Sequence, residues 1–282
     1  MKIFLDSADL DEIIQARNYG ILDGVTTNPS LLKKAVLKRQ KQGQQVDMQD
    51  YIRQILLEAW QVPVSLEVIG LDQESMLRQG RFLYYNFNKL AGNVYIKVPV
   101  NPALELDDSN HFHGLSVIKA LADEGIPVNC TLVFTPEQAL LAAKAGAAIV
   151  SPFAGRVDDF LRQENKLPFV KTDYFPAQGL ESVQIPSDAG IVSGIDLVDK
   201  CVELLELHGF STEVLAASLR NPRQTREAAL TGAHIATLPL EVISDLLIHD
   251  KTLEGMRLFT EDVVPEYAQF LEQGSKDGQD RL

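Results

Sequence analysis

The sequence predicts an α/β fold, a single (β/α)₈ TIM barrel, on three observations. Its 282 residues suit one large barrel. Short apolar segments alternate with amphipathic helical patterns from the first residue to about residue 248, in eight strand–helix units. Such alternation is typical of parallel sheets, and eight units favour a closed barrel over an open sheet. Polar residues also stand near the ends of the predicted strands, where barrel enzymes carry their chemistry.

The predicted elements follow one another regularly along the chain. The strands are short apolar runs at residues 2–6, 24–28, 63–68, 94–98, 128–134, 147–153, 213–218 and 234–238. The helices follow them at residues 8–17, 48–60, 73–88, 115–123, 136–145, 195–207, 223–231 and 240–248. Asp11 and Glu12 near the start of the first helix, and Thr135 and Pro136 at the start of the fifth, are N-terminal helix signals.

Some segments lie outside this alternation. A last helix is expected at about 253–271, and a polar tail at 272–282 closes the chain. This helix would cap the barrel, cover its mouth or pack on a neighbouring subunit, so a homo-oligomer is one possible outcome. Two connections, 101–114 and 158–190, are longer than a barrel needs, and both follow strand ends where loops shape access to a site. With no internal repeat, we expect one domain over 1–282.

The chain is acidic, with 26 Lys and Arg against 39 Asp and Glu and a net charge of −13. Proteins that bind nucleic acids need a basic surface, and the basic cluster at residues 33–42 has the pattern of a solvated helix or loop face. We therefore expect no nucleic-acid partner. An acidic protein can still hold an anionic small substrate in a locally positive cleft.

Signals for secretion and membrane insertion are not found. No run approaches the roughly 20 apolar residues of a membrane span. The N-terminal segment reaches the acidic Asp6 too early for a secretory signal. Cys130 and Cys201 make no disulfide framework. We expect a cytoplasmic protein without a membrane partner.

Polar residues occupy inward positions of the predicted strands. Side chains alternate in and out along a strand, so the apolar residues of each strand identify the side that faces the helices. This alternation predicts that the following residues point into the barrel near the strand ends: Asp6, Thr26, Asn28, Glu67, Lys97, Asn129, Thr131, Ser151 and Ser218. The eighth strand offers Thr237. Barrel interiors are normally filled by Val, Ile and Leu, so this pattern indicates a site.

Lys97 is the most informative of these residues. Val94, Ile96 and Val98 suit the layer that faces the helices, which places Lys97 inside the barrel. Desolvation disfavours a buried ammonium, and a neutral amine can attack a carbonyl to form an iminium. The alternative is a structural pair of Lys97 with Asp6 or Glu67. A carboxylate nearby would also serve an aldol cleavage, which needs a base for the hydroxyl proton.

Two arginines follow the sixth and seventh strands. Arg156 and Arg220 stand where guanidinium groups can hold a phosphate in a bidentate manner, and Ser218 adds a donor. The alternative for each arginine is a surface ion pair, which we prefer for Arg223.

Metal and nucleotide chemistry find little support. His111 and His113 lie in a polar loop rather than on a strand, and the other histidines are scattered. No Gly-rich phosphate loop follows a predicted strand. Cys130 faces the helices and has no partner histidine. We expect no metal and no cofactor.

Eight segments in this order resemble the transaldolase family, which includes the fructose-6-phosphate aldolases. They are FLDSAD (4–9), GVTTNPSLL (24–32), SLEV (65–68), IKVPV (96–100), NCTLVF (129–134), SPFAGR (151–156), AASLR (216–220) and TLPLEV (237–242). The resemblance implies an enzyme that moves a dihydroxyacetone unit from a ketose phosphate to an aldose phosphate through a lysine Schiff base. It also implies the pentose phosphate pathway as the metabolic setting.

The resemblance implies a role for each matching residue. Lys97 matches the Schiff-base lysine, and Asp6 matches the carboxylate that handles the proton of the C4 hydroxyl. Glu67 and Thr131 match the pair that holds a catalytic water. Residues that match contacts to the three-carbon unit are Asn28, Asn129 and Ser151. The set that matches the phosphate site is Arg156, Ser218 and Arg220.

Two positions separate the subgroups of this family. Fructose-6-phosphate aldolases typically have Gln where this chain has Glu67 and Tyr where it has Phe153, so both positions favour transfer over cleavage. The first alternative is an aldolase that releases free dihydroxyacetone. The second is a sugar-phosphate-binding protein without catalysis, against which the retained Lys97, Asp6 and Glu67 argue.

Overall fold

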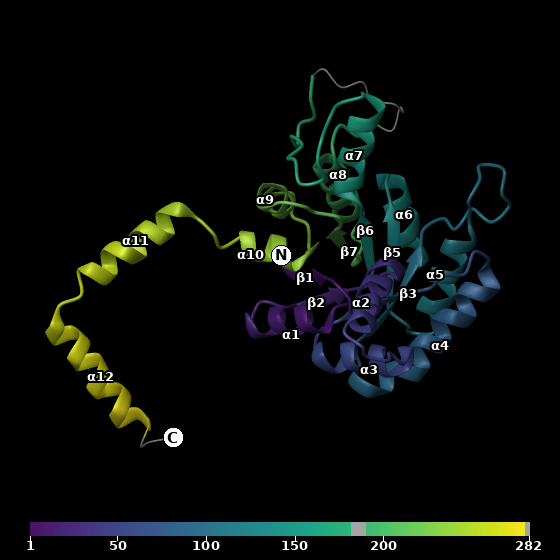
Figure 1. Ribbon diagram of the computed structural model, residues 1–282. Helices are drawn as coiled ribbons and strands as arrows, with labels where there is room; N and C mark the ends of the chain where they lie inside the picture. Colours follow the sequence, from purple (N-terminus) through teal and green to yellow (C-terminus); the bar gives the residue numbers. More distant parts are fainter. Residues whose placement is uncertain (182–189, 280–282) are drawn as a thin grey trace. The chain divides into compact units, whose positions relative to one another are not determined.

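Eight parallel strands close into a barrel in the computed structural model, which describes residues 1–181 and 190–279 (Figure 1). Neighbours in the barrel follow the order of the sequence, and the last strand pairs with the first. The strands are β1 (Lys2–Asp6), β2 (Gly24–Thr26), β3 (Val64–Glu67), β4 (Val94–Pro99), β5 (Val128–Val133), β6 (Ile149–Pro152), β7 (Glu213–Ala216) and β8 (Ile235–Leu238). The predicted (β/α)₈ fold is confirmed, and each predicted strand is present within two residues at either end.

Each strand is followed by at least one helix. The helices of the barrel are α1 (Leu10–Asn18), α2 (Pro29–Lys41), α3 (Met48–Glu58), α4 (Gln73–Ala91), α5 (His113–Asp123), α6 (Pro136–Ala145), α7 (Ala154–Glu164), α8 (Gly194–Leu207), α9 (Pro222–Leu230) and α10 (Leu240–Asp245). All eight predicted helices are present. Helix α2 was predicted only as a basic helix or loop face, and α7 was not predicted.

Two apolar layers lie on opposite sides of the sheet. Val94, Ile96 and Val98 belong to the large cluster between strands and helices, as their alternation predicted. A smaller cluster fills the barrel and includes Phe4 and Ile149 with three further buried residues. The polar residues near the strand ends therefore stand above an apolar floor.

One strand is irregular. Leu132 has a left-handed backbone with φ of +58°, and the pairing of β5 with β6 shifts between Cys130 and Val133. Such a bulge re-aims the residues that follow it. Val133 accordingly packs in the outer cluster, whereas simple alternation from Thr131 would point it inward.

The chain divides into two units, Met1–Ile243 and Ser244–Leu282. The second unit contains α11 (Asp250–Glu261) and α12 (Pro265–Gln279), where the sequence predicted one helix at 253–271. Proline lacks an amide hydrogen and disfavours helical backbone before it, so Pro265 starts a new helix. Helix α12 continues into the predicted tail, of which residues 280–282 lie outside the described residues, as do residues 182–189 of the long connection.

Among the residues that the structure describes, no helix has the length and apolar character to cross a bilayer.

Candidate active site

The structure gathers most of the predicted site at one small cavity, of about 90 Å³, at the C-terminal end of the barrel. Its predicted members are Asp6, Asn28, Lys97, Ser151, Phe153, Arg156 and Ser218. Thr26 and Thr237, which the sequence analysis also named among the polar residues of the barrel, complete the lining with Leu215 and Ala217. The remaining predicted residues, Glu67, Asn129, Thr131 and Arg220, do not line this cavity.

Lys97 is buried in the barrel, with 5% of its surface exposed. Its Nζ lies 3.2 Å from Oε2 of Glu67 and donates to the carbonyl oxygen of Thr27 at 3.3 Å. Glu67 is the register partner of Lys97 on the neighbouring strand, so strand pairing itself brings the two charges together. A buried ammonium needs such a partner. One carboxylate therefore balances the lysine, and Asp6 is a second, separate one.

Asp6 ends β1 beside the same cavity. Its carboxylate accepts a hydrogen bond from Thr26 Oγ1 at 2.8 Å, and Thr26 shares a second, 2.5 Å hydrogen bond with Thr237. Burial raises the pKa of Asp6 above its usual 3.8, although the charge of Lys97, the Thr26 hydrogen bond and the charge of Arg156 act against this shift. A carboxylate with a raised pKa is a stronger base.

A chain of hydrogen bonds connects β6, β5 and β3 inside the barrel. Ser151 Oγ donates to Asn129 Oδ1 at 2.7 Å, and Asn129 Nδ2 donates to Ser65 Oγ at 3.1 Å. Thr131 is also buried, and within the described residues its hydroxyl has no hydrogen-bond partner. This hydroxyl is therefore available to a substrate or a water molecule.

Asn28 and Phe153 shape the side of the cavity. Asn28 caps α2, because its Oδ1 accepts from the backbone N–H of Leu31 at 2.9 Å. The Nδ2 group of Asn28 makes no hydrogen bond to another described residue, so it can donate to a ligand. The Phe153 ring lies 5.8 Å from the Phe134 ring between centroids, and the Arg156 guanidinium lies 5.1 Å from the Phe153 centroid.

The predicted phosphate residues meet where α7 begins. Arg156 is in the first turn of α7 and lines the cavity with Ser218. A Cβ atom at position 155 would lie only 2.1 Å from the Ser218 carbonyl oxygen, so Gly155 permits this close approach. Arg220 lies beside them and forms an ion pair with Asp159 at 2.6 Å. Guanidinium and hydroxyl donors thus converge here.

The alternative of a surface ion pair is met at Arg223. Its Nε lies 3.3 Å from Glu227, and its guanidinium lies 3.7 Å above the centroid of the Tyr174 ring. Glu227 lies on α9 with Arg223, and Tyr174 lies in the connection between α7 and α8, so both contacts stabilise the packing of this connection on α9.

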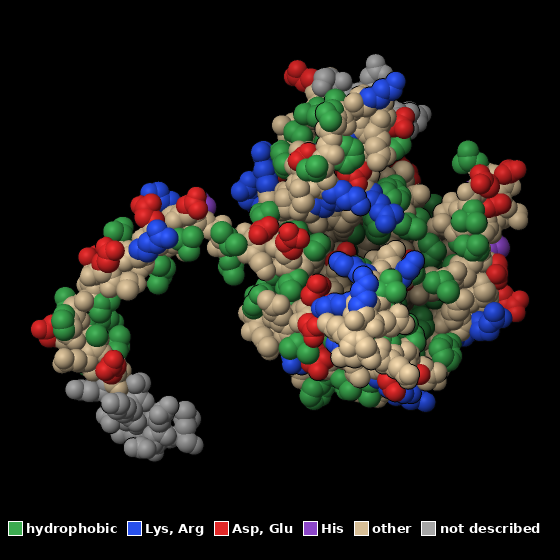
Figure 2. All heavy atoms as spheres, viewed as in Figure 1, with side chains coloured by type: hydrophobic (Ala, Val, Ile, Leu, Met, Phe, Trp, Pro, Cys, Tyr) green, Lys and Arg blue, Asp and Glu red, His purple; other side chains and the backbone are tan. Residues whose placement is uncertain are grey.

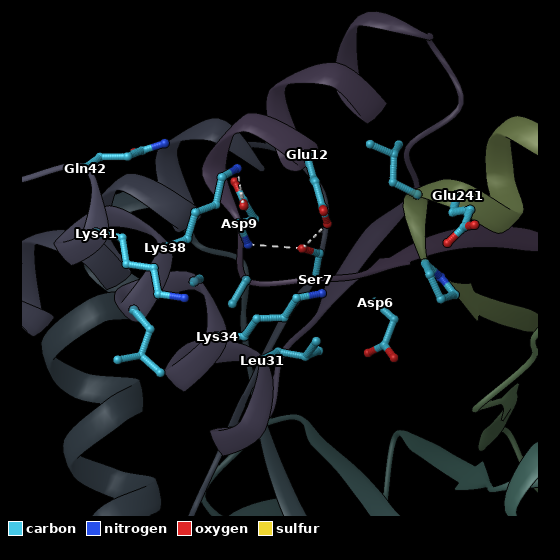
Figure 3. A pocket seen from close by; sticks show the side chains of 15 residues that line it. Asp6, Ser7, Asp9, Glu12, Leu31, Lys34, Lys38, Lys41, Gln42 and Glu241 are labelled. Carbon is cyan, nitrogen blue, oxygen red and sulfur yellow. Dashed lines mark hydrogen bonds and ion pairs between the residues drawn. The ribbon is translucent and has the colours of Figure 1, made fainter. Parts of the chain in front are cut away.

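A second and larger cavity, of about 730 Å³, shares Asp6 with the first. Three lysines of α2 line it, Lys34, Lys38 and Lys41 (Figure 3). Lys38 is held by Asp9 at 2.6 Å, and Figure 3 shows Lys34 extending toward Ser7 and Asp6. Figure 2 shows Lys and Arg side chains gathered over α2 at the edge of a hollow. An acidic chain thus carries local positive charge near the predicted base.

The structure also shows polar contacts that the sequence analysis did not include. Ser65 lies on β3 two residues before Glu67, so the same alternation pointed it inward and was a signal that could have found it. Asp159 lies on α7, which was not predicted, so nothing indicated its contact with Arg220.

His111, considered above as a potential metal ligand, makes hydrogen bonds with Asn101 and with the carbonyl oxygen of Leu106. No group of three potential metal ligands is found within residues 1–181 and 190–279.

Comparison with known proteins gives matches along almost the whole chain. A family model described as transaldolase/fructose-6-phosphate aldolase matches residues 3–278. A probable transaldolase of Exiguobacterium sibiricum is 39% identical over 262 residues, which are 93% of this chain and 97% of that protein. A probable transaldolase of Chlorobium phaeovibrioides is 40% identical over 262 residues, with the same coverage of each chain. A probable transaldolase of Aquifex aeolicus is 38% identical over 268 residues, or 94% and 99% of the two chains.

Proposed function

The chain belongs to the transaldolase/fructose-6-phosphate aldolase family, and we propose that it is a transaldolase. In this proposal it transfers a dihydroxyacetone unit from a ketose phosphate, such as fructose 6-phosphate or sedoheptulose 7-phosphate, to an aldose phosphate. One observation carries it: Lys97 is buried beside a cavity that also contains the separate carboxylate of Asp6. The fitting setting is the pentose phosphate pathway in the cytoplasm, where the free, buried Cys130 and Cys201 would stay reduced.

The first half-reaction forms and uses an iminium. The Lys97 amine attacks the C2 carbonyl of the ketose and water leaves, with Glu67 3.2 Å away to exchange protons. The hydroxyl of Thr131, which has no hydrogen-bond partner among the described residues, holds a water for this exchange in the proposal. Asp6 then takes the proton of the C4 hydroxyl, the C3–C4 bond breaks, and its electrons flow to the iminium. An aldose phosphate leaves, and the three-carbon unit stays on Lys97 as an enamine.

The second half-reaction reverses these steps on an acceptor. The enamine carbon attacks the aldehyde carbon of the acceptor, and Asp6 returns the proton to the new alkoxide. Hydrolysis of the iminium then frees the product and Lys97. The lysine is itself the electron sink, so the proposal requires no metal and no organic cofactor.

Substrate contacts follow from residues that line the cavity, together with Asn129 and Arg220, which hydrogen-bond to or lie beside lining residues. Asn28 donates through Nδ2, and Ser151 and Asn129 present a hydrogen-bonded pair to the hydroxyls of the three-carbon unit. Arg156, Ser218 and Arg220 receive the phosphate. These groups hold the reacting carbons against Lys97. Such positioning contributes much of the rate acceleration when an enzyme joins two reactants.

Product analysis tests the proposal. Fructose 6-phosphate is incubated with and without erythrose 4-phosphate, and the products are measured by mass spectrometry. We expect sedoheptulose 7-phosphate only with the acceptor and little free dihydroxyacetone without it. Rapid release of dihydroxyacetone without acceptor would instead establish the aldolase alternative and overturn the argument from Glu67 and Phe153.

Substitution of the lysine tests the mechanism. Lys97→Ala removes the electron sink, so turnover should fall below detection while the melting curve stays cooperative. Borohydride with fructose 6-phosphate should add covalent mass to Lys97 in the wild-type protein and none in the variant. A wild-type protein that gains no mass would support the alternative of a non-catalytic sugar-phosphate binder.

A further inference from the structure

Arg220 is held by a carboxylate from a different element. Nη1 of Arg220 donates to Oδ1 of Asp159 at 2.7 Å, and Nη2 donates to Oδ2 at 2.6 Å. The two side chains are 16% and 15% exposed, so the pair is largely shielded from water. Bidentate pairs of this kind fix the plane of the guanidinium as well as its position.

One edge of the guanidinium makes no hydrogen bond to a described residue, and its Nε lies over Gly155, 2.8 Å from where a Cβ atom would be. Arginine has five N–H donors. Asp159 takes one from each terminal nitrogen, and the Lys171 carbonyl takes the second donor of Nη1 at 3.3 Å. Nε–H and the remaining N–H of Nη2 have no hydrogen bond to a described residue. These two donors are parallel on one edge, which is the arrangement that accepts two phosphate oxygens.

The backbone of Arg220 is fixed by Gln224 of α9, which in turn bonds to α7, the helix that carries Asp159. Its N–H donates to Gln224 Oε1 at 2.9 Å, and Gln224 Nε2 donates to the buried Asp158 at 2.7 Å. The adjacent aspartates of α7 therefore act on two different parts of Arg220. Asp158 acts on the main chain through Gln224, and Asp159 acts on the side chain.

We propose that Asp159 is a positioning residue for phosphate recognition, which holds the terminal nitrogens of Arg220 so that the Nε–Nη2 edge receives the substrate phosphate. This inference rests on the proposed function, since it assigns Arg220 to the phosphate of the sugar. It also assigns a role to part of the long connection after β6, because the Lys171 carbonyl completes the hold. Asp159 itself touches no substrate in this account.

Two variants test it. Asp159→Asn removes the charge, and Asp159→Glu keeps the charge but lengthens the arm. We expect each to raise KM for fructose 6-phosphate by about three- to tenfold, because a freed arginine side chain must be ordered on binding. The change in kcat should be smaller than the change in KM. With unphosphorylated fructose as donor, the factor by which each variant lowers kcat/KM should be at least threefold smaller than with fructose 6-phosphate.

Glu124→Gln provides the matched control. Glu124 also makes a bidentate pair, with Nε and Nη2 of Arg81, but this pair joins α4 to the C-terminal end of α5. This variant should leave the KM for fructose 6-phosphate within twofold of wild type. Melting temperatures of all variants establish that each is folded.

Calorimetric binding of inorganic phosphate gives a readout that does not need turnover. Weaker phosphate binding in both Asp159 variants supports the inference even if the wild-type protein proves not to be a transaldolase. Unchanged or tighter binding in Asp159→Asn would overturn it, since the carboxylate would then act only as an opposing charge. Equal losses on fructose and fructose 6-phosphate would also overturn it.

Discussion

The carboxyl group of Asp6 lies where burial favours its neutral form. Its pKa is raised by burial, while Lys97, the Thr26 hydroxyl and Arg156 oppose the shift. The proposed mechanism needs the ionised form, which takes a proton from the C4 hydroxyl. Activity should therefore fall on the acid side at a pH above that of an ordinary aspartate.

This position gives a pH prediction. In the wild-type protein kcat/KM should fall about tenfold per pH unit once the pH drops below the raised pKa of Asp6. Asp6→Asn keeps an acceptor for Thr26 but cannot act as a base, so kcat/KM should fall at least about 100-fold and lose this limb. The profile is measured from pH 4 to 8. Asp11→Asn, a change at an exposed neighbour, should keep the decrease of kcat/KM at acid pH. The same decrease in Asp6→Asn would show that Asp6 is not the base of the mechanism.

At the scale of residues, the sequence predicted positions better than partners. Alternation along β4 was enough to place Lys97 inside, because the period of a strand is two. It could not decide between Asp6 and Glu67 as the ion-pair partner, since both point inward. Strand register decides this, because Glu67 is the residue opposite Lys97. The contact of Arg220 with Asp159 joins two different β/α units, and no local pattern predicts such a contact.

At the scale of elements, the strands were predictable and two helices were not. Helix α2 has only Ala35 fully buried, so its sequence shows little of the apolar periodicity that identifies a helix. Helix α7 begins without a side-chain cap, after Phe153, and its start carries residues of the candidate site. Both lie directly after strand ends. Functional demands on these residues weaken the local signals there.

Three helices meet at Asp158. Its carboxylate on α7 accepts from the N–H of Gly194 in α8 and from Nε2 of Gln224 in α9, each at 2.7 Å. Burial raises the pKa of Asp158 to about 7. The folded protein therefore keeps this proton up to about pH 7, whereas the unfolded chain loses it near 3.8. Stability must fall as pH rises through this window.

Asp158→Asn tests this linkage. The amide cannot accept from Gln224, so the variant should be less stable than wild type at pH 5, by about 1–3 kcal/mol. The amide also cannot titrate, so the variant does not lose stability as the pH rises. Its free energy of unfolding relative to wild type should therefore increase by roughly 4 kcal/mol between pH 4 and 8. The free energy of unfolding in urea at several pH values measures both effects. Asp123→Asn, on the exposed face of α5, should show a small and constant gap, and a constant gap in Asp158→Asn would contradict the linkage.

At the scale of the whole molecule, charge and apolar surface have separate consequences. The net charge of −13 opposes the approach of sugar phosphates, whereas the lysines of α2 supply local positive potential beside the candidate site. The surface of the second unit, in contrast, is rich in apolar side chains. Within the second unit taken by itself, twelve large apolar side chains between residues 246 and 271 are exposed, and α11 has no buried residue.

Exposed apolar surface on this scale predicts self-association. Monomeric proteins rarely expose a large contiguous apolar patch, and burial of such surface contributes about 25 cal/mol per Å². We therefore expect a homo-oligomer, with a mass by light scattering that is a multiple of the 31.2 kDa chain. The double variant Phe259→Ser and Phe270→Ser, on α11 and α12, should shift the population toward monomer at micromolar concentration. Trp60→Ser removes an exposed aromatic from the barrel unit and should leave the mass unchanged. A wild-type monomer at every concentration would show that this segment packs on its own barrel, and the three outcomes considered from the sequence would then be reduced to two.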